Sequence, residues 1–311
     1  MAGSLGAATH PKAKLGRISA MTMVSPHVFA SEGAILRGQL YAPDAAGPAP
    51  VVVMAHGFSA VAAQLEPQAR AFADAGFAAF VYDNPGFGLS GGYPRQEVDP
   101  VRQVRGYRDA VTYVRTLAGA DRDRIAIWGS SFSGGHVLQA GAMDPRVAAV
   151  VSQAPFISGW ELIGGWPNGA ELIAQTVAER EARSAGAEPA VMPVVNTPDQ
   201  PAALPGNDGY VYFTATGGPT WKNEVTLSSF EMVRAHEPAL WIARIAPRPL
   251  LMIVAEEDLV TPTAHALAAF ERAGEPKRVV MVPGGHFDVY SGAGFDTATA
   301  ETVSWLKAQL V

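Results

Sequence analysis

An extended apolar run, a turn of very small residues and a helix-forming segment follow one another at residues 124–135, and this order constrains the fold more than any other feature. The run ends at Trp128, and the turn is Gly129-Ser-Ser-Phe-Ser-Gly-Gly135. This order is typical of a nucleophile elbow, in which a serine occupies the strained apex of a strand-to-helix turn. Such a serine needs small residues two places before and two places after it. Ser131 has Gly129 and Ser133 there, although glycine is usual at the second place.

Two neighbouring serines compete with Ser131 for the apex. Ser130 would have Trp128 two places before it, and the size of tryptophan excludes that arrangement. Ser133 has small neighbours, but it lies two residues farther from the strand and already within the helix. We therefore predict Ser131 as the nucleophile. The alternative is a glycine- and serine-rich turn without chemistry.

Composition narrows the class of protein. The 311 residues allow one large α/β domain or two modest ones, and the hydrophobic content of 48% with 17% charged residues is typical of a globular chain. The net charge of −6 gives no reason to expect a nucleic acid or an anionic membrane as partner. Cysteine is absent, which excludes disulfides, thiolate nucleophiles and cysteine-based metal sites.

The N-terminal segment has basic residues but no continuous apolar stretch after them, so we expect no signal peptide. No apolar run approaches the ~18 residues that a membrane span requires. A cytoplasmic location is the default expectation. We expect a small-molecule substrate as partner and allow for a homo-oligomer, since the sequence does not determine the oligomeric state.

Apolar runs alternate with helical patterns along most of the chain. The predicted strands are near 35–41, 51–55, 78–82, 125–128, 147–151, 250–254 and 278–282, the first as an edge strand. The predicted helices cover 66–76, 99–117, the segment after the elbow, 263–273 and 298–310. This alternation predicts an α/β fold with a mostly parallel sheet and helices on both faces.

The segment 158–247 interrupts the alternation. It is rich in aromatic residues and in proline, and we interpret it as an inserted, largely helical cap with helices near 159–182 and 226–237. The alternative is an unusually long loop, which is rare in compact domains unless it is functional. We expect a loose tail at 1–20 and a core domain formed by 21–157 and 248–311.

A serine hydroxyl becomes a good nucleophile when a histidine removes its proton and a carboxylate orients that histidine. In elbow-type enzymes the chain order is serine, acid, histidine. Asp258 follows a buried strand at the edge of the sheet where ligand-facing side chains emerge, and we predict it as the acid. Glu256 and Glu257 are rivals that lie nearer the strand end.

His286 follows the last predicted strand within a glycine turn, and we predict it as the base. Asp288 is better interpreted as a residue that caps or solvates this turn. His136 is expected to pack beneath the elbow, and His56 to make structural hydrogen bonds.

Acyl transfer also needs two N–H donors for the developing oxyanion. The elbow supplies the backbone N–H of Phe132. The loop His56-Gly-Phe-Ser59, which follows the strand at 51–55, supplies the N–H of Phe58.

The run Gly86-Phe-Gly-Leu-Ser-Gly91 matches the GxGxxG pattern of dinucleotide sites, but proline and tyrosine follow it where a helix should begin. We interpret it as a packing turn whose loop is anchored by Asp83. No two-histidine metal spacing occurs, and we predict neither a cofactor nor a metal.

Together these motifs resemble the α/β-hydrolase superfamily over about residues 35–311, with His56-Gly-Phe58, the 83–90 turn, the elbow, Asp258 and His286 in the family's order. The elbow most resembles the branch around dienelactone hydrolases and Xaa-Pro dipeptidyl-peptidase-like proteins, which includes enzymes of polyketide clusters. The founding dienelactone hydrolases use cysteine, and the Xaa-Pro peptidase and cocaine esterase group has a tyrosine where this chain has Phe58, so peptidase activity is not implied. Dehalogenases and epoxide hydrolases have an aspartate where this chain has Ser131.

The residues and the resemblance predict a serine hydrolase that cleaves a carboxylic ester, thioester or lactone through an acyl-enzyme. The aromatic segment 158–247 indicates an apolar acyl group, for instance that of a natural-product intermediate. The candidate substrate contacts are Trp160, Trp166, Tyr210 and Trp221. The alternatives are an acyltransferase with an alcohol or amine acceptor, a C–C bond or amide hydrolase, and a binding protein with an inactive site.

Overall fold

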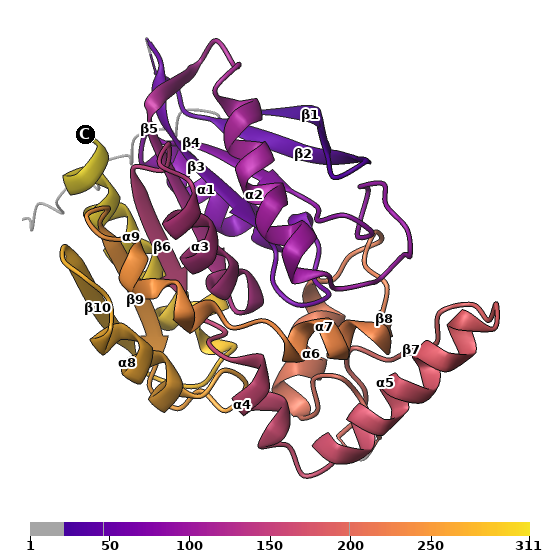
Figure 1. Ribbon diagram of the computed structural model, residues 1–311. Helices are drawn as coiled ribbons and strands as arrows, with labels where there is room; N and C mark the ends of the chain where they lie inside the picture. Colours follow the sequence, from indigo (N-terminus) through magenta and orange to yellow (C-terminus); the bar gives the residue numbers. More distant parts are fainter. Residues whose placement is uncertain (1–21, 46, 199) are drawn as a thin grey trace, which may run out of the picture.

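A twisted eight-stranded sheet forms the centre of the molecule, with strand order β1-β2-β4-β3-β5-β6-β9-β10 (Figure 1). The computed structural model describes residues 22–311 except 46 and 199. The strands are β1 (Met23–Ser31), β2 (Ala34–Ala42), β3 (Ala49–Ala55), β4 (Ala78–Tyr82), β5 (Ala120–Ser130), β6 (Ala149–Gln153), β9 (Leu250–Ala255) and β10 (Lys277–Val282). β2 pairs antiparallel with β1 and β4, and the other neighbours pair in parallel. The predicted mostly parallel α/β class is confirmed.

Helices cover both faces of this sheet. α2 (Pro100–Val114), α3 (Phe132–Met143) and α8 (Thr263–Glu271) pack on one face, and α1 (Glu66–Asp74) and α9 (Gly292–Leu310) on the other. β3, β4, β6 and β9 are buried along their whole length, as expected for parallel strands between two helical layers. The two apolar cores therefore lie on opposite faces of one sheet.

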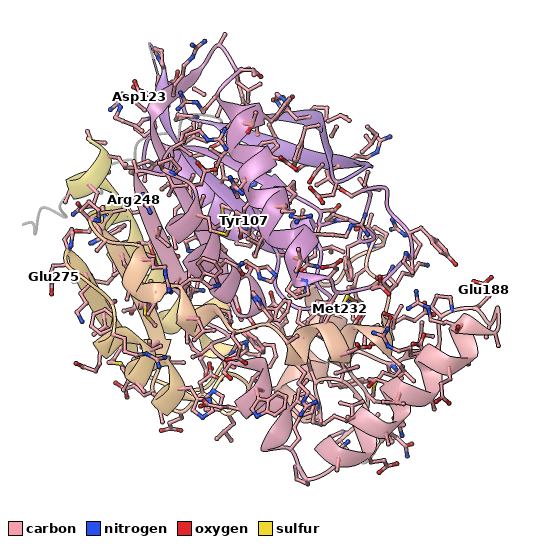
Figure 2. The ribbon with its side chains drawn as sticks, viewed as in Figure 1. Tyr107, Asp123, Glu188, Met232, Arg248 and Glu275 are labelled. Carbon is pink, nitrogen blue, oxygen red and sulfur yellow. The ribbon has the colours of Figure 1, made fainter. Side chains whose placement is uncertain are left out.

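α2 illustrates how the sequence positions the carboxyl ends of the strands, where the elbow lies. Its N-cap is Asp99, whose carboxylate accepts from the N–H groups of Val101 and Arg102, and Pro100 occupies the first turn. Tyr107 projects from α2 into the core (Figure 2). Its hydroxyl lies 3.0 Å from the N of Ala55 and 2.9 Å from the O of Trp128. α2 therefore fixes the ends of β3 and β5, from which the loops of the site emerge.

The segment 158–247 forms a group of helices below the end of the sheet, on the side of the molecule away from Asp123, and Met232 and Glu188 lie within it (Figure 2). Its helices are α4 (Gly159–Gly164), α5 (Gly169–Ser184), α6 (Asn207–Thr216) and α7 (Ser228–Arg234), with the 3₁₀ turns η2 (Pro238–Leu240) and η3 (Ile242–Arg244) and the short pair β7 (Val191–Met192) and β8 (Val225–Thr226). The single helix predicted over 159–182 is in fact α4 and α5, because Pro167 falls between them. The helix predicted over 226–237 is shorter, and α6 was not predicted.

Two further expectations need comment. The strand predicted at 35–41 is present as β2, but it is not the edge strand, because β1 pairs along its outer side. The alternation of apolar and polar residues in β2 reflects one covered face rather than a free edge.

The tail expected at 1–20 lies outside the described residues. None of the helices within the described ranges is long and apolar enough to cross a membrane.

Candidate active site

Ser131 lies between the end of β5 and the start of α3, at the apex of the elbow. Its φ of 60° and ψ of −123° are a strained backbone conformation for a residue with a side chain. The neighbouring strand holds it, because the Ser131 N–H donates to the carbonyl of Gln153 at 2.9 Å and its own carbonyl accepts from the Phe156 N–H at 2.9 Å. A Cβ on Gly129 would lie 2.2 Å from the backbone oxygen of Ser133, so the predicted need for a small residue at that place is confirmed.

The serine found where glycine is usual has a structural role in this elbow. The Ser133 hydroxyl donates to the carbonyl of Ala55 at 2.8 Å and accepts from the N–H of Ser130 at 2.9 Å. Ser133 is therefore fully engaged beneath the turn and does not face the base. Its hydrogen bonds connect the elbow to the end of β3, next to the loop that carries Phe58.

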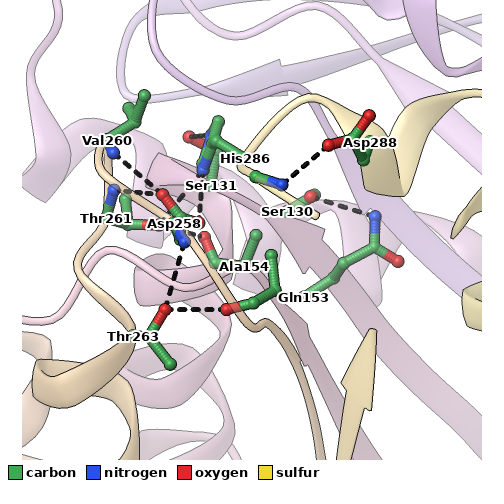
Figure 3. A network of polar contacts seen from close by, with 12 residues as sticks. Ser130, Ser131, Gln153, Ala154, Asp258, Val260, Thr261, Thr263, His286 and Asp288 are labelled. Atoms are coloured by element: carbon green, nitrogen blue, oxygen red, sulfur yellow. Dashed lines mark hydrogen bonds and ion pairs between the residues drawn. The ribbon is translucent and has the colours of Figure 1, made fainter. Parts of the chain in front are cut away.

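The structure brings the three residues predicted from chain order into one line of hydrogen bonds (Figure 3). His286 Nε2 lies 3.0 Å from Ser131 Oγ, and His286 Nδ1 lies 2.7 Å from Asp258 Oδ2. The side chains of His286 and Asp258 are 4% and 1% exposed. With the Nδ1 hydrogen directed at the carboxylate, Nε2 is left as the acceptor for the serine proton.

Asp258 owes its orientation to the turn that follows β9. Its Oδ1 accepts from the N–H groups of Val260 at 2.9 Å and Thr261 at 2.7 Å. The Thr261 hydroxyl lies 2.9 Å from Oδ2 and 3.2 Å from His286 Nδ1. These donors together meet both oxygens of this buried carboxyl group. Sequence reasoning missed Thr261, although an aspartate that opens a turn commonly accepts from the backbone N–H two residues on, as Asp258 does from Val260.

The rival residues lie elsewhere. Glu256 and Glu257 are exposed. Asp288 accepts from the N–H of Gly285 at 2.7 Å and so closes the turn that presents His286, as predicted.

The two residues whose backbone N–H groups are predicted for the oxyanion line the same cavity as Ser131. The N–H of Phe132 is at the first position of α3, where the helix dipole also favours negative charge. Phe58 lies in the loop after β3, and its ring meets that of Phe132 edge to face at 5.9 Å. Among the hydrogen bonds of the described residues, neither N–H is engaged with a protein acceptor. Both are therefore available to an oxygen held beside Ser131.

His56 fixes the loop that carries Phe58. Its Nδ1 lies 3.0 Å from the carbonyl of Gly57, and its Nε2 accepts from the N–H of Asn84 at 3.0 Å. Burial lowers the pKa of His56, against the opposing influence of the nearby Asp83 carboxylate. Its predicted structural role is confirmed.

His136 packs beneath the elbow, also as predicted. Its two nitrogens meet Gln103 Oε1 at 2.8 Å and His236 Nε2 at 3.1 Å. Burial lowers the pKa of His236 to about 3, and burial together with His236 holds the pKa of His136 well below its ordinary value. This neutral pair joins α3 to the segment 158–247, directly behind the ring of Phe132.

The glycine-rich turn at 86–91 is not followed by a helix. Asp83 accepts from the N–H groups of Ala62 at 2.7 Å and Leu89 at 2.9 Å, so it anchors this loop as predicted. Within the described residues, no group of three or more histidine, aspartate or glutamate side chains could hold a metal ion.

Ser131 opens onto an apolar cavity of about 120 Å³. Phe132 and Phe156 form its floor, and Trp166, Leu204 and Phe230 of the segment 158–247 contribute much of the remaining wall. A larger groove of about 330 Å³ lies between α4, α5 and α7, but it contains none of the three hydrogen-bonded residues. We therefore assign the site to the cavity of about 120 Å³ that Ser131 lines, and we call it the acyl cavity.

The four aromatic residues predicted as substrate contacts separate in the structure. Trp166 lines the cavity beside Ser131. Trp160 is 60% exposed, lies on the separate groove and stacks under Arg234 at 3.8 Å. Trp221 donates its indole N–H to the carbonyl of Ser59 at 2.9 Å, and neither it nor Tyr210 is among the lining residues.

Comparisons with known proteins agree with the α/β fold described above. The family model described as "Serine aminopeptidase, S33" matches residues 46–290. A thiohydrolase of Aspergillus aculeatus is 34% identical over 292 residues, which cover 89% of this chain and 90% of the relative. A polyketide transferase of Aspergillus fumigatus is 31% identical and covers 90% of this chain and 96% of that protein. The crystal structure of the α/β hydrolase GrgF from Penicillium sp. sh18 superposes with a TM-score of 0.82 at 27% identity, covering 93% of this chain and 99% of that one.

Proposed function

The chain belongs to the family of α/β-hydrolases described as serine aminopeptidase S33, and we propose that it cleaves a carboxylic ester, thioester or lactone with an apolar acyl group. One observation carries the proposal above all. The line of hydrogen bonds from Asp258 through His286 to Ser131 ends at the wall of an apolar cavity. An activated hydroxyl beside an apolar surface suits a substrate whose reactive carbonyl is attached to a hydrocarbon group.

In the proposed acylation step, Ser131 Oγ attacks the carbonyl carbon while His286 Nε2 takes its proton. Asp258 keeps its charge and stabilises the imidazolium that forms. The negative charge that develops on the carbonyl oxygen is accepted by the N–H groups of Phe58 and Phe132. Each such donor contributes roughly 3–4 kcal/mol in comparable sites.

The tetrahedral intermediate then collapses, and the bond from carbon to the leaving sulfur or oxygen breaks. His286 gives its proton to the leaving atom. Water repeats the sequence on the acyl-enzyme, with His286 as base, and releases the acid.

The relatives support two versions of the second half. The thiohydrolase of Aspergillus aculeatus favours a thioester substrate and water as the acceptor. The polyketide transferase of Aspergillus fumigatus favours the same acyl-enzyme with an alcohol or amine as the acceptor, which is the second candidate function. Both versions use the same residues, so product analysis with and without an added acceptor separates them.

The experiment that tests the proposal is labelling with a fluorophosphonate probe, followed by peptide mapping and intact mass. We expect one adduct, on Ser131, and its loss in Ser131→Ala and His286→Ala. Ser130→Ala is the matched control, because it removes the neighbouring hydroxyl that is not bonded to His286, and it should still be labelled. An adduct on another residue, or an unlabelled wild-type protein with the fold intact, would contradict the proposal.

A further inference from the structure

A second, smaller cavity of about 40 Å³ lies on the His286 side of Ser131. It shares Ser131 with the acyl cavity of about 120 Å³, but it is also lined by His286, Tyr212 and Tyr290. A space of this size holds roughly three water molecules. The leaving atom must lie on this side if His286 protonates it, and so must the water that replaces it.

Tyr290 lines this second cavity, which we call the chamber. It lies at the end of η4 (Asp288–Tyr290), four residues after His286. Its ring meets the His286 ring edge to face at 6.1 Å and packs on Tyr212 of α6 at 5.1 Å. Its hydroxyl lies 2.8 Å from Ser130 Oγ. Burial and the neighbouring Tyr212 raise the pKa of the Tyr290 phenol, which therefore stays protonated at neutral pH.

The direction of the hydrogens follows from counting donors. The amide nitrogen of Gln153 can only donate, and it lies 3.2 Å from Ser130 Oγ (Figure 3). Ser130 is buried, and among the described contacts the remaining partner for its own hydrogen is the Tyr290 oxygen. A relay that runs from Gln153 to Ser130 to Tyr290 gives the Ser130 hydrogen an acceptor, and in this arrangement the Tyr290 hydrogen is free to point into the chamber.

Two other polar side chains of the chamber are already engaged. His56 is held by Gly57 and Asn84. The Gln64 oxygen accepts from the Val61 N–H, and its nitrogen donates to the Thr216 hydroxyl. The Tyr290 hydroxyl is therefore a donor at the wall of the chamber that Ser131 and His286 also line.

We propose that Tyr290 donates a hydrogen bond to the leaving atom as its bond to the acyl carbon breaks. The inference rests on the proposed function, since it needs Ser131 as nucleophile and His286 as acid. The electron pair of the broken bond goes to the leaving sulfur or oxygen, the proton comes from His286 Nε2, and Tyr290 keeps its own proton. Ser130 and Gln153 are positioning residues that orient the phenol.

The test is a set of esters and thioesters that share one acyl group and differ in the leaving group, from p-nitrophenol to a simple alkanol or alkanethiol. Tyr290→Phe should lower kcat/KM for the alkyl substrates on the order of 10- to 100-fold, because a hydrogen bond to a charged atom is lost. The p-nitrophenyl ester, whose leaving group needs little help, should lose less than about 3-fold. Labelling of Ser131 by the fluorophosphonate should be retained.

Tyr41→Phe is the matched control, because it removes a buried tyrosine hydroxyl from β2, whose partner is Gln39, and should leave the leaving-group dependence unchanged. Ser130→Ala keeps the phenol but removes the group that orients it, and should give the same dependence with a smaller amplitude. This second variant decides the matter if Tyr290→Phe does not fold.

The outcomes separate the two proposals. A loss that is equal for all leaving groups, or no loss, in a Tyr290→Phe protein that is still labelled overturns the role of Tyr290 and leaves the proposed function standing. Undiminished turnover by Ser131→Ala overturns the proposed function itself.

Discussion

At the scale of single residues, the site depends on one strained backbone conformation that several hydrogen bonds hold in place. Ser131 has a positive φ, and the bonds of its N–H and carbonyl to Gln153 and Phe156 fix it at the end of β6. The Ser133 hydroxyl adds a bond from beneath. This arrangement exposes the Ser131 hydroxyl while the rest of the turn stays buried, and it presents Oγ to His286 before any substrate binds.

The carboxylate behind His286 gives a sharp prediction at this scale. Asp258→Asn preserves the size of the side chain but offers an amide to His286 Nδ1, which favours the wrong tautomer of the imidazole. We expect kcat for an activated ester to fall by about 10⁴-fold with little change in KM. Steady-state kinetics measures the effect.

Asp288→Asn is the control for that measurement, because Asp288 holds the neighbouring turn through Gly285 and is not among the described hydrogen-bond partners of the His286 ring. A loss below about tenfold is expected. An equal loss in both variants would mean that the turn geometry, rather than the charge behind the histidine, limits the reaction.

At the scale of elements, the segment 158–247 supplies much of the wall of the acyl cavity, while the sheet supplies the reacting groups. Trp166 follows α4, and its ring meets that of Phe230 on α7 edge to face at 6.3 Å. The cavity therefore depends on how α4 and α7 pack together as much as on the sheet and its loops. Substrate selectivity should change with residues of this segment while the labelling of Ser131 does not.

Trp166→Ala tests this division of roles. Removing the indole enlarges the cavity, so we expect kcat/KM for the best short acyl ester to fall about tenfold and the preference to move toward longer or bulkier acyl groups, at roughly 0.8 kcal/mol for each additional buried methylene. A panel of p-nitrophenyl esters of increasing chain length measures the change.

Trp160→Ala is the matched control, because this tryptophan lies on the separate groove against Arg234. Its acyl-chain profile should follow that of the unmodified protein. A shift in both variants would place the acyl group in the larger groove instead.

At the scale of the whole molecule, three histidines with lowered pKa values are buried where the segment 158–247 and the loop after β3 meet the sheet and its helices. Burial lowers the pKa of His56 and His136, and lowers that of His236 to about 3. In the unfolded chain each would titrate near its ordinary pKa of about 6.5. The unfolded state therefore binds more protons below pH 6.5, and the folded state loses stability as the pH falls from 6.5 toward 3.

We accordingly expect the free energy of unfolding to be constant with respect to these groups above pH 6.5 and to fall below it, by up to about 1.4 kcal/mol per pH unit for each histidine. Urea unfolding at pH 7, 6 and 5 measures it. His236→Gln removes one of the titrating groups, so its stability should depend less steeply on pH than that of the unmodified protein. Parallel pH profiles for the two proteins would contradict this assignment.

Much of the fold and of the candidate site could be predicted from the chain alone. The alternation of apolar runs and helical patterns predicted the parallel sheet, because each run had to be buried between helices. The helix boundary at Asp99 and the need for glycine at 129 were readable because capping and backbone sterics act between neighbours in the chain. The breaks within 158–247 were less clear, since short helices joined by prolines have no strong periodicity.

The sequence by itself determined which residues the elbow, the acid turn and the histidine turn present, since each is a local motif at the end of its own strand. Only the tertiary structure decided what surrounds them. Gln153 and Tyr290 meet at Ser130, and Trp166 reaches the cavity while Trp160 faces away. The physical reason is distance along the chain: most of these contacts join elements that are far apart in sequence, and no local pattern fixes how such elements pack.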